Sequence, residues 1–304
     1  MKEKSATPAI LPRDWAFLFF GIFSMSMSAI FLKAANTSPF TVGFYRMAFA
    51  LAGAAPILIF QDKKRRETAG LPSFFSKKRW PAIRFALFGG IFWGISLSSW
   101  NVSVLHSNAT TATLVNNLAP LWTGLIMLLF FKEKPAPRFW IGLFVALVGV
   151  SVMFWPTLSH FQVHWTTWLV LGGSFSYAFY IIIQKKAREK GLSAIEMLFW
   201  MNLVALLFFL VECVVTSAPL FDFPQKTWLA LACAGLVSSL LGWGLIGHAM
   251  LRLPVTITAL ALLNQAVFTG ILDYLIFGVE LNQFQFFGGF IVLMGLGLVV
   301  FKKQ

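Results

Sequence analysis

Ten long apolar runs decide which solvent this chain can fold in. A bilayer core about 30 Å thick needs about 20 apolar residues in a helix that rises about 1.5 Å per residue. Runs of that length, poor in charge, lie near residues 15–35, 40–60, 82–105, 109–131, 137–155, 165–184, 193–217, 227–250, 254–277 and 284–301. The sequence therefore predicts an all-α membrane protein with ten transmembrane helices.

The charges are distributed as expected for a chain threaded through a membrane. Only 12% of the residues are charged, about half the usual share in soluble proteins. If the amino terminus is inside, all of the 24 Lys and Arg residues except Lys33, Arg46 and Lys226 lie in tails or loops on the inner side. Cytoplasmic loops carry such an excess of basic residues, so we predict that both termini are cytoplasmic. Nucleic-acid binding is disfavoured despite the net charge of +13, because it needs a continuous basic face.

The two halves of the sequence resemble each other at an offset of 147 residues. The offset aligns Asn117 with Asn264 and Glu133 with Glu280. Each half holds five predicted helices, and an odd number gives the halves opposite orientations in the membrane. The predicted organisation is a tail at 1–14, a first repeat at 15–155, a second repeat at 165–301 and a tail at 302–304. Inverted-topology repeats of this kind are typical of secondary transporters.

Motifs in the first half also resemble a known family. SPFTVGFYR opens the second predicted helix, and NNLAPLW, followed by KEK and a glycine, crosses the fourth and fifth. The chain resembles the EamA type of the drug/metabolite transporter superfamily over essentially its whole length, in two copies. The second copy departs from the pattern, because Val267 stands where the first copy has Pro120. The resemblance implies ten helices around a central cavity, with the fifth and tenth at the periphery, and transport by alternating access.

Side-chain amides in the fourth and ninth spans mark a candidate substrate site. Polar side chains inside a membrane are costly and tend to face protein or water. Asn117 and Asn264 are equivalent under the repeat, with Asn116 and Gln265 beside them. Pro120 removes a backbone hydrogen bond and frees the carbonyl of Asn116, which kinks the helix. We expect a polar, substrate-binding notch near the midplane; the alternative is that the amides only join helices.

Aromatic side chains recur at helical spacing in three further spans. Tyr177 and Tyr180 share one face of the sixth helix. Trp93 and Trp100 share a face of the third helix, and Trp243 lies in the eighth. We expect these rings to wall the cavity and to bind a small amphipathic ligand by stacking or cation–π contact. The alternative is that they face lipid or form an interfacial belt.

Charged residues within the spans are candidates for gating or coupling. Arg46 lies about 9 Å inside the outer end of the second helix, and a cation at that depth needs a partner, for which we expect Asp273. The pair is interpreted as an outer gate; alternatively, Arg46 binds a substrate carboxylate or extends to the outer headgroups. His248, near the inner mouth, is a further candidate because it can titrate. Glu196 and Glu212 are expected at the membrane interfaces.

These residues favour a secondary transporter over an enzyme. No G-x-S-x-G motif occurs, and the sequence indicates neither a cofactor nor a metal site. Residues 254–301 hold no Lys or Arg, which argues against phosphorylated substrates because those need fixed cations. We expect export of small amphipathic metabolites, most of all amino acids or related compounds, across a bacterial inner membrane. The alternatives are efflux of hydrophobic amines or drugs by antiport with protons, the candidate coupling ion, and a channel.

Overall fold

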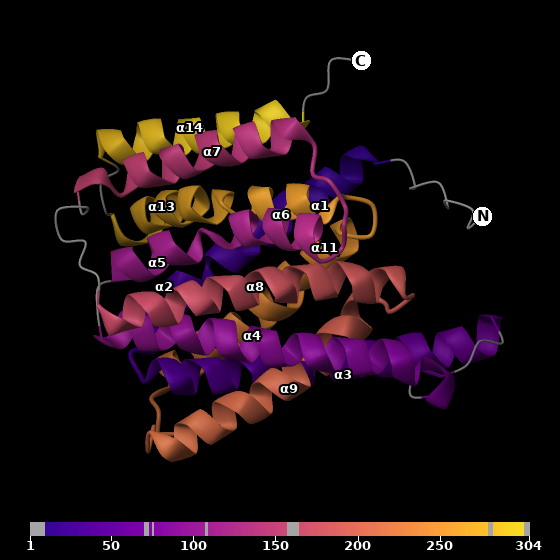
Figure 1. Ribbon diagram of the computed structural model, residues 1–304. Coiled ribbons are helices and arrows are strands. Elements are labelled where there is room, and N and C mark those ends of the chain that lie inside the picture. Colours follow the sequence, from indigo (N-terminus) through magenta and orange to yellow (C-terminus); the bar gives the residue numbers. More distant parts are fainter. Residues whose placement is uncertain are drawn as a thin grey trace, which may run out of the picture.

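The chain folds into a layered bundle of helices that run roughly parallel to one another (Figure 1). The computed structural model describes residues 10–69, 73–74, 76–106, 109–156, 164–278 and 282–300. Its helices are α1 (Pro12–Ser26), α2 (Ser28–Ala35), α3 (Pro39–Ala69), η1 (Lys77–Arg79), α4 (Trp80–His106), α5 (Ala109–Asn116), α6 (Ala119–Leu129), α7 (Pro137–Met153), α8 (Trp165–Glu189), α9 (Ala194–Val215), α10 (Gln225–Cys233), η3 (Ala234–Gly242), α11 (Trp243–Ala249), α12 (Val255–Ala261), α13 (Asn264–Phe277) and α14 (Gln283–Val300).

The predicted all-α fold with ten transmembrane helices is confirmed. Within the described ranges, nine segments are long and apolar enough to cross a membrane, and α7 adds a shorter apolar helix. α7 lies along α14 at one edge of the bundle (Figure 1). Their backbones approach closely through glycines, since a Cβ added at Gly149 would lie 2.8 Å from the carbonyl oxygen of Gly288. Small residues permit such contacts between transmembrane helices.

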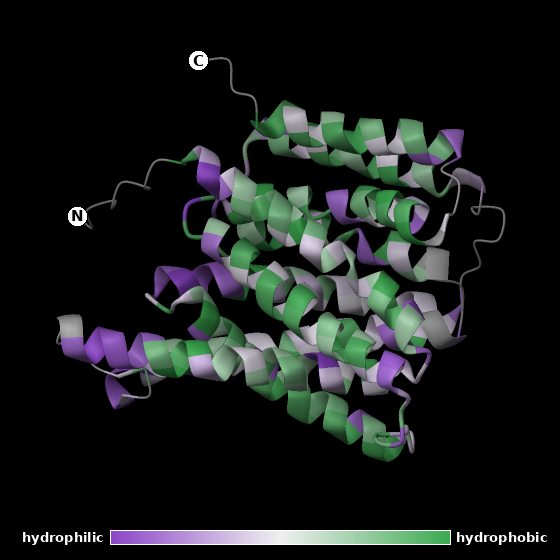
Figure 2. Ribbon diagram, turned by 180° about the vertical axis from the view of Figure 1, so that it is seen from behind, coloured by the Kyte–Doolittle hydropathy of each residue, from purple (hydrophilic) through white to green (hydrophobic). Residues whose placement is uncertain are grey.

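α3 extends well beyond its predicted span. The apolar run ends near residue 60, but the helix continues to Ala69 and carries the KKRR cluster on its extension, which is the hydrophilic projection in Figure 2. Lys, Arg, Gln and Glu are good helix formers, which explains why the helix continues past its apolar residues. Asp62 accepts hydrogen bonds from the backbone N–H of Phe74, at 2.6 Å, and from the hydroxyl of Ser73, at 3.0 Å. These bonds fold the chain back against the extension.

The fourth and ninth spans, which are equivalent under the repeat, are both interrupted near their middle. The fourth divides into α5 and α6 at residues 117–118, and the ninth divides into α12 and α13 at residues 262–263. Pro120 follows the first break directly and lacks the N–H that would bond the carbonyl of Asn116. The second break has Val267 in place of the proline, and short i to i−3 backbone bonds run through it. A proline is therefore not required to break this kind of helix.

The eighth span changes helix type across its middle. α10 passes into the π-helix η3, which is followed by α11. π-Helical turns are rare and occur frequently at functional sites. η3 packs against α1 and α3, and a Cβ added at Gly235 would lie only 2.9 Å from the backbone carbonyl oxygen of Arg46. The π-helix therefore brings its serines close to the part of α3 that holds Arg46.

Polar side chains join the helices at one end of the bundle. α1 begins and α14 ends at this end (Figure 1), which the charge distribution predicts to be cytoplasmic. Lys185 and Arg188 of α8 donate to backbone carbonyls at the end of α11, at 2.7 and 2.9 Å. The last carbonyls of a helix lack partners within it, so these two cations cap α11. Arg252 pairs with the fully buried Asp14 at 3.1 Å, which adds α1 to the same junction.

Candidate functional site

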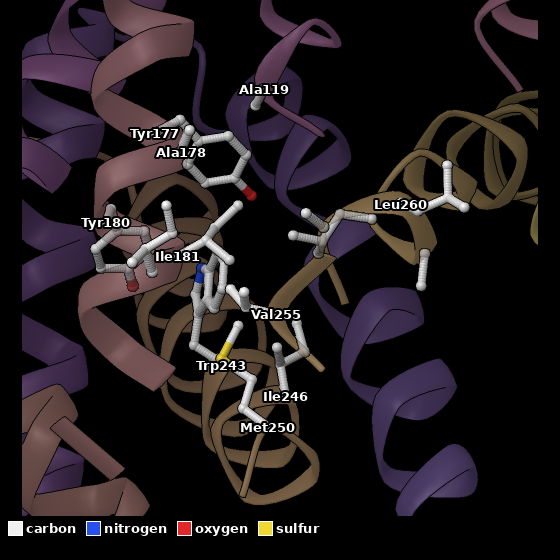
Figure 3. Packing of buried hydrophobic residues seen from close by; sticks show 14 of the residues in the cluster. Ala119, Tyr177, Ala178, Tyr180, Ile181, Trp243, Ile246, Met250, Val255 and Leu260 are labelled. Carbon is white, nitrogen blue, oxygen red and sulfur yellow. The ribbon is translucent and has the colours of Figure 1, made fainter. Parts of the chain in front are cut away.

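Four aromatic side chains from α4, α8 and α11 form a buried cluster. Trp93 stacks on Tyr180 with ring centroids 4.5 Å apart, and Trp243 meets Tyr180 edge-on at 5.0 Å. Tyr177 lies 6.0 Å from Trp93 and 6.1 Å from Trp243. None of the four side chains is more than 7% exposed, and Figure 3 shows three of them within the surrounding apolar core. Rings predicted on three separate spans thus meet at one place.

Arg46 of α3 lies beside this aromatic cluster. Its guanidinium carbon is 5.8 Å from the centroid of the Trp93 ring, within the range of a cation–π contact. Nε donates to the hydroxyl of Ser239 at 2.6 Å, and Nη1 donates to the hydroxyl of Ser28 at 2.8 Å. The side chain is 6% exposed, and no acidic residue of the described ranges pairs with it. Two neutral hydroxyls leave its positive charge uncompensated, which suits an anionic ligand group.

The ion pair predicted between Arg46 and Asp273 is not formed. Asp273 bonds instead to Nζ of Lys33 at 2.9 Å, and this pair joins α13 to α2. Lys33 occupies the last turn of α2 and meets Asp273 at the surface, whereas Arg46 lies deeper, beside the rings. The two side chains of the Lys33–Asp273 pair are 56% and 22% exposed, and ion pairs of this kind contribute about 0–1 kcal/mol. The outer connection therefore involves a different cation from the one expected.

Sequence reasoning missed the hydroxyls that hold Arg46. Ser28 follows an interruption at Met27, which divides the first span into α1 and α2. Ser239 lies in the π-helix η3. No local motif marks either serine as a partner. The available signal was the depth of Arg46, because a cation inside a membrane needs acceptors from neighbouring helices.

The predicted amides lie at the two helix breaks. Asn264 is fully buried at the start of α13, and its Nδ2 donates to the carbonyl of Ala261 at 2.9 Å. Asn116 Oδ1, Asn117 Nδ2 and Asn264 Oδ1 are buried with no hydrogen-bond partner in the described protein. Gln265 is half-buried. In the part of the chain that the structure describes, no hydrogen bond joins these amides to the aromatic cluster, so the predicted notch and wall are separate groups.

The breaks nevertheless adjoin the aromatic cluster. Ala119 of α6 and Leu260 of α12 belong to the same buried core as Tyr177, and the Tyr177 hydroxyl points toward the side on which these two helices lie (Figure 3). The hydroxyl of Tyr177 and Nε1 of Trp243 are also buried without partners in the described protein. Buried polar atoms are nearly always hydrogen-bonded. These unpaired donors and acceptors are therefore available to hydrogen-bond a ligand.

Trp100 and His248 lie at the margin of this arrangement. Trp100 is half-buried and about 10 Å along α4 from Trp93. The structure gives it no ring contact with the cluster among the described residues. His248 is exposed, with its ring 5.1 Å from that of Phe17. Neither residue is brought to Arg46.

Glu196 and Glu212, near the two ends of α9, both contact neighbouring helices. Glu196 is fully buried and bonds Arg79 at 2.6 Å, and its backbone N–H is capped by Ser193. Glu212 accepts a hydrogen bond from the hydroxyl of Ser98, and its second oxygen is buried without a partner in the described protein. Their positions near the helix ends are as expected, and Arg79 and Ser98 supply hydrogen-bond donors for the two carboxylates.

Comparison with known proteins agrees with this architecture. The EamA-like transporter family matches residues 14–155 and 164–301. "Uncharacterized transporter YyaM" of Bacillus subtilis (strain 168) is 23% identical over 277 residues, covering 86% of this chain and 87% of that protein. "S-adenosylmethionine uptake transporter" of Rickettsia bellii (strain RML369-C) is 23% identical over 265 residues, covering 87% and 84%. A solved structure titled "Crystal structure of protein" has a TM-score of 0.76 at 15% identity over 94% of this chain and 96% of that one, which is a likeness of fold.

Proposed function

The chain belongs to the EamA-like transporter family, and from this premise we propose that it carries amino acids or their derivatives across a membrane by alternating access. The predicted relationship to the drug/metabolite transporter superfamily is confirmed, and the chain is an integral membrane protein that transports small metabolites. The observation that carries the narrower proposal is the buried Arg46 beside four aromatic rings.

The chemistry of this site favours a ligand with a carboxylate and a flat or cationic part. A guanidinium binds a carboxylate through parallel hydrogen bonds, which assigns the acid group to Arg46. The faces of Trp93, Trp243 and the two tyrosines offer stacking or cation–π contact to the rest of the ligand. S-adenosylmethionine, which relatives in Rickettsia are named for, is an amino acid that carries both an aromatic base and a cationic sulfur. It is therefore the first compound to test.

Hydrophobic amines fit this site less well than amino acids. An amine lacks the carboxylate that would compensate Arg46, and no acidic residue of the described ranges pairs with that arginine. A cation placed against the rings alone would be repelled by the guanidinium. We therefore favour a substrate that brings its own negative charge.

A ligand-stabilisation melt followed by counterflow tests this proposal. A ligand that binds the native state raises the melting temperature by mass action. At a ligand concentration of 100 times the Kd, the free energy of unfolding increases by about 2.7 kcal/mol. We expect S-adenosylmethionine, methionine or tryptophan to stabilise the purified protein, and tryptamine and phosphorylated metabolites not to. In proteoliposomes, unlabelled substrate inside should accelerate entry of labelled substrate, as a carrier requires and a channel does not. Equal stabilisation by tryptamine and tryptophan would overturn the assignment of the carboxylate to Arg46. Entry of labelled substrate at a rate that does not depend on internal substrate would indicate a channel.

Tyr177→Phe is expected to raise the melting temperature without ligand and to weaken transport. The Tyr177 hydroxyl is buried with no partner in the described protein, and leaving such a group unpaired costs about 1–3 kcal/mol. Its removal therefore stabilises the empty protein, while the substrate loses a hydrogen bond and KM rises by about fivefold. Melting curves and proteoliposome uptake measure the two effects. Tyr274→Phe is the control, because Tyr274 is 49% exposed; an unchanged KM in Tyr177→Phe would remove this hydroxyl from the site.

A further inference from the structure

Two adjoining hollows lie at the end of α4 that is predicted to be cytoplasmic, and they share Pro81. The larger, of about 620 Å³, lies between α4 and α9 and is lined mainly by Arg84, Phe85, Phe88, Ile91 and Val204. The smaller, of about 330 Å³, is lined by Lys78, Arg79, Pro81, Ala82 and Lys190. One hollow is largely apolar and the other is basic. Because Pro81 lines both, we treat the two hollows as one amphipathic groove, which we call the α4 groove.

The apolar part of the α4 groove faces outward from the bundle. Arg84, Phe88 and Ile91 are spaced by four and three residues and so share one face of α4. Phe88 is 52% exposed and Ile91 is 42% exposed. The opposite face packs inward, since a Cβ added at Gly90 would lie 2.5 Å from the carbonyl oxygen of Met201. In a membrane-spanning helix, an outward apolar face meets acyl chains, so this hollow opens to lipid.

The basic part of the α4 groove carries cations that are free to bind an anion. Lys78, Arg84 and Lys190 are all exposed. In the described ranges, the side chains of Lys78 and Arg84 have no acidic partner, whereas Arg79 is held by Glu196. Nζ of Lys190 lies 5.5 Å from the centroid of the Phe85 ring, which keeps it over the boundary between the two hollows. Lys78 and Lys190 therefore line the smaller hollow and Arg84 lines the larger one, with Pro81 common to both.

These three cations lie at the level expected for the lipid headgroups. Trp80, one helical turn before Arg84, is 49% exposed, and exposed tryptophans collect at the membrane–water interface. Ile91 lies about 10 Å deeper along the helix than Arg84. A ligand that fills the whole groove must have an anionic group at the interface and a hydrocarbon chain running inward from it.

We propose that the α4 groove is a binding site for one anionic phospholipid of the inner leaflet. The lipid phosphate lies among Lys78, Arg84 and Lys190, and an acyl chain lies along Phe88 and Ile91. Charge complementarity selects an anionic lipid over a zwitterionic one, because each basic residue at the membrane surface contributes about fivefold to the affinity for anionic headgroups. The site is distinct from the substrate site, which lies among α3, α4, α8 and α11.

Native mass spectrometry of the full chain in detergent tests this site. Phosphatidylglycerol should bind with saturation at one equivalent and at least fivefold more tightly than phosphatidylcholine. Arg84→Gln should weaken phosphatidylglycerol binding by about fivefold, and the double variant Lys78→Gln, Lys190→Gln by more. Lys64→Gln is the matched control, since Lys64 is an exposed cation on the extension of α3, at the same side of the protein. A melting curve in detergent alone checks that each variant is folded.

Ile91→Trp tests the apolar half by filling it, and it should weaken phosphatidylglycerol binding while leaving all three cations in place. Glycerol phosphate, the headgroup without chains, should bind at least tenfold more weakly than the lipid. Equal losses in Arg84→Gln and Lys64→Gln would show a general surface charge effect and overturn the site. Equal binding of glycerol phosphate and lipid would overturn the role of the apolar hollow.

Discussion

Arg46→Gln is expected to weaken the binding of carboxylated substrates by about 10- to 150-fold and to leave the binding of their methyl esters unchanged. A hydrogen bond to a charged group contributes about 1.5–3 kcal/mol, and the charge on Arg46 is met in the described structure only by two hydroxyls and a tryptophan face. An ester presents no anion to the guanidinium, so its affinity should change little when Arg46 is replaced. Kd values for the acid and the ester are measured in the wild type and in Arg46→Gln. The four values together isolate the interaction between Arg46 and the carboxylate.

The Arg46→Gln variant should remain folded. Its amide can hydrogen-bond the hydroxyls of Ser28 and Ser239, and it removes a buried charge, which is costly inside a membrane. Arg66→Gln is the control, because Arg66 lies on the exposed extension of α3 and pairs with Asp62 at 3.1 Å. Equal losses for acid and ester would mean that Arg46 only supports the packing of the rings. Arg46→Lys should recover part of the acid binding, since it restores the charge without the planar fork.

Hydropathy predicts how deep a residue lies in the membrane, but not which way it faces around the helix axis. This distinction explains what could be predicted. The ten spans follow from apolar length alone, and the shared face of Tyr177 and Tyr180 follows from helical spacing. The partner of Arg46 depends on how α1, α3 and η3 are rotated against each other. The sequence places Asp273 at about the same depth as Arg46, but Asp273 lies nearer the surface and bonds Lys33.

Close packing decides which predicted rings meet. A Cβ added at Gly173 would lie 2.6 Å from the Cβ of Ser99, so α8 can lie against α4 only because the residue is glycine. This contact brings Tyr177 and Tyr180 to Trp93, two turns from Trp100 on the same helix. Spacing along one helix could not distinguish the two tryptophans, because both lie on the same face. The difference is set by the level at which α8 and α11 cross α4.

The proposed substrate site and the junction at the predicted cytoplasmic end share the helices α8 and α11. Tyr180 of α8 contacts Trp243 of α11 with ring centroids 5.0 Å apart, and about one and a half to two turns further along α8 Lys185 and Arg188 hold the end of α11. Under the proposed alternating access, opening this end must separate α8 from α11. That movement would break the ring contact and the two side-chain caps together. A substrate between the rings is therefore placed to influence the opening of this junction.

Asn117→Leu is expected to abolish transport while the protein stays folded in the membrane. Nδ2 of Asn117 is buried at the break between α5 and α6 with no partner in the described protein, so an apolar side chain of similar size breaks no internal bond there. Amides that only join helices contribute about 0.6 kcal/mol, too little to stop transport.

The control for Asn117→Leu is Asn202→Leu, in the uninterrupted helix α9. Asn202 is 2% exposed, and its Nδ2 is likewise buried without a partner in the described protein, so the chemical change is the same and only the helix break differs. Counterflow and melting temperature are measured for both variants, and only Asn117→Leu should lose counterflow. Wild-type counterflow in Asn117→Leu would remove this amide from the mechanism. Equal loss of counterflow in both variants would assign the effect to buried amides in general. The position of Asn117 at a helix break would then have no role in transport.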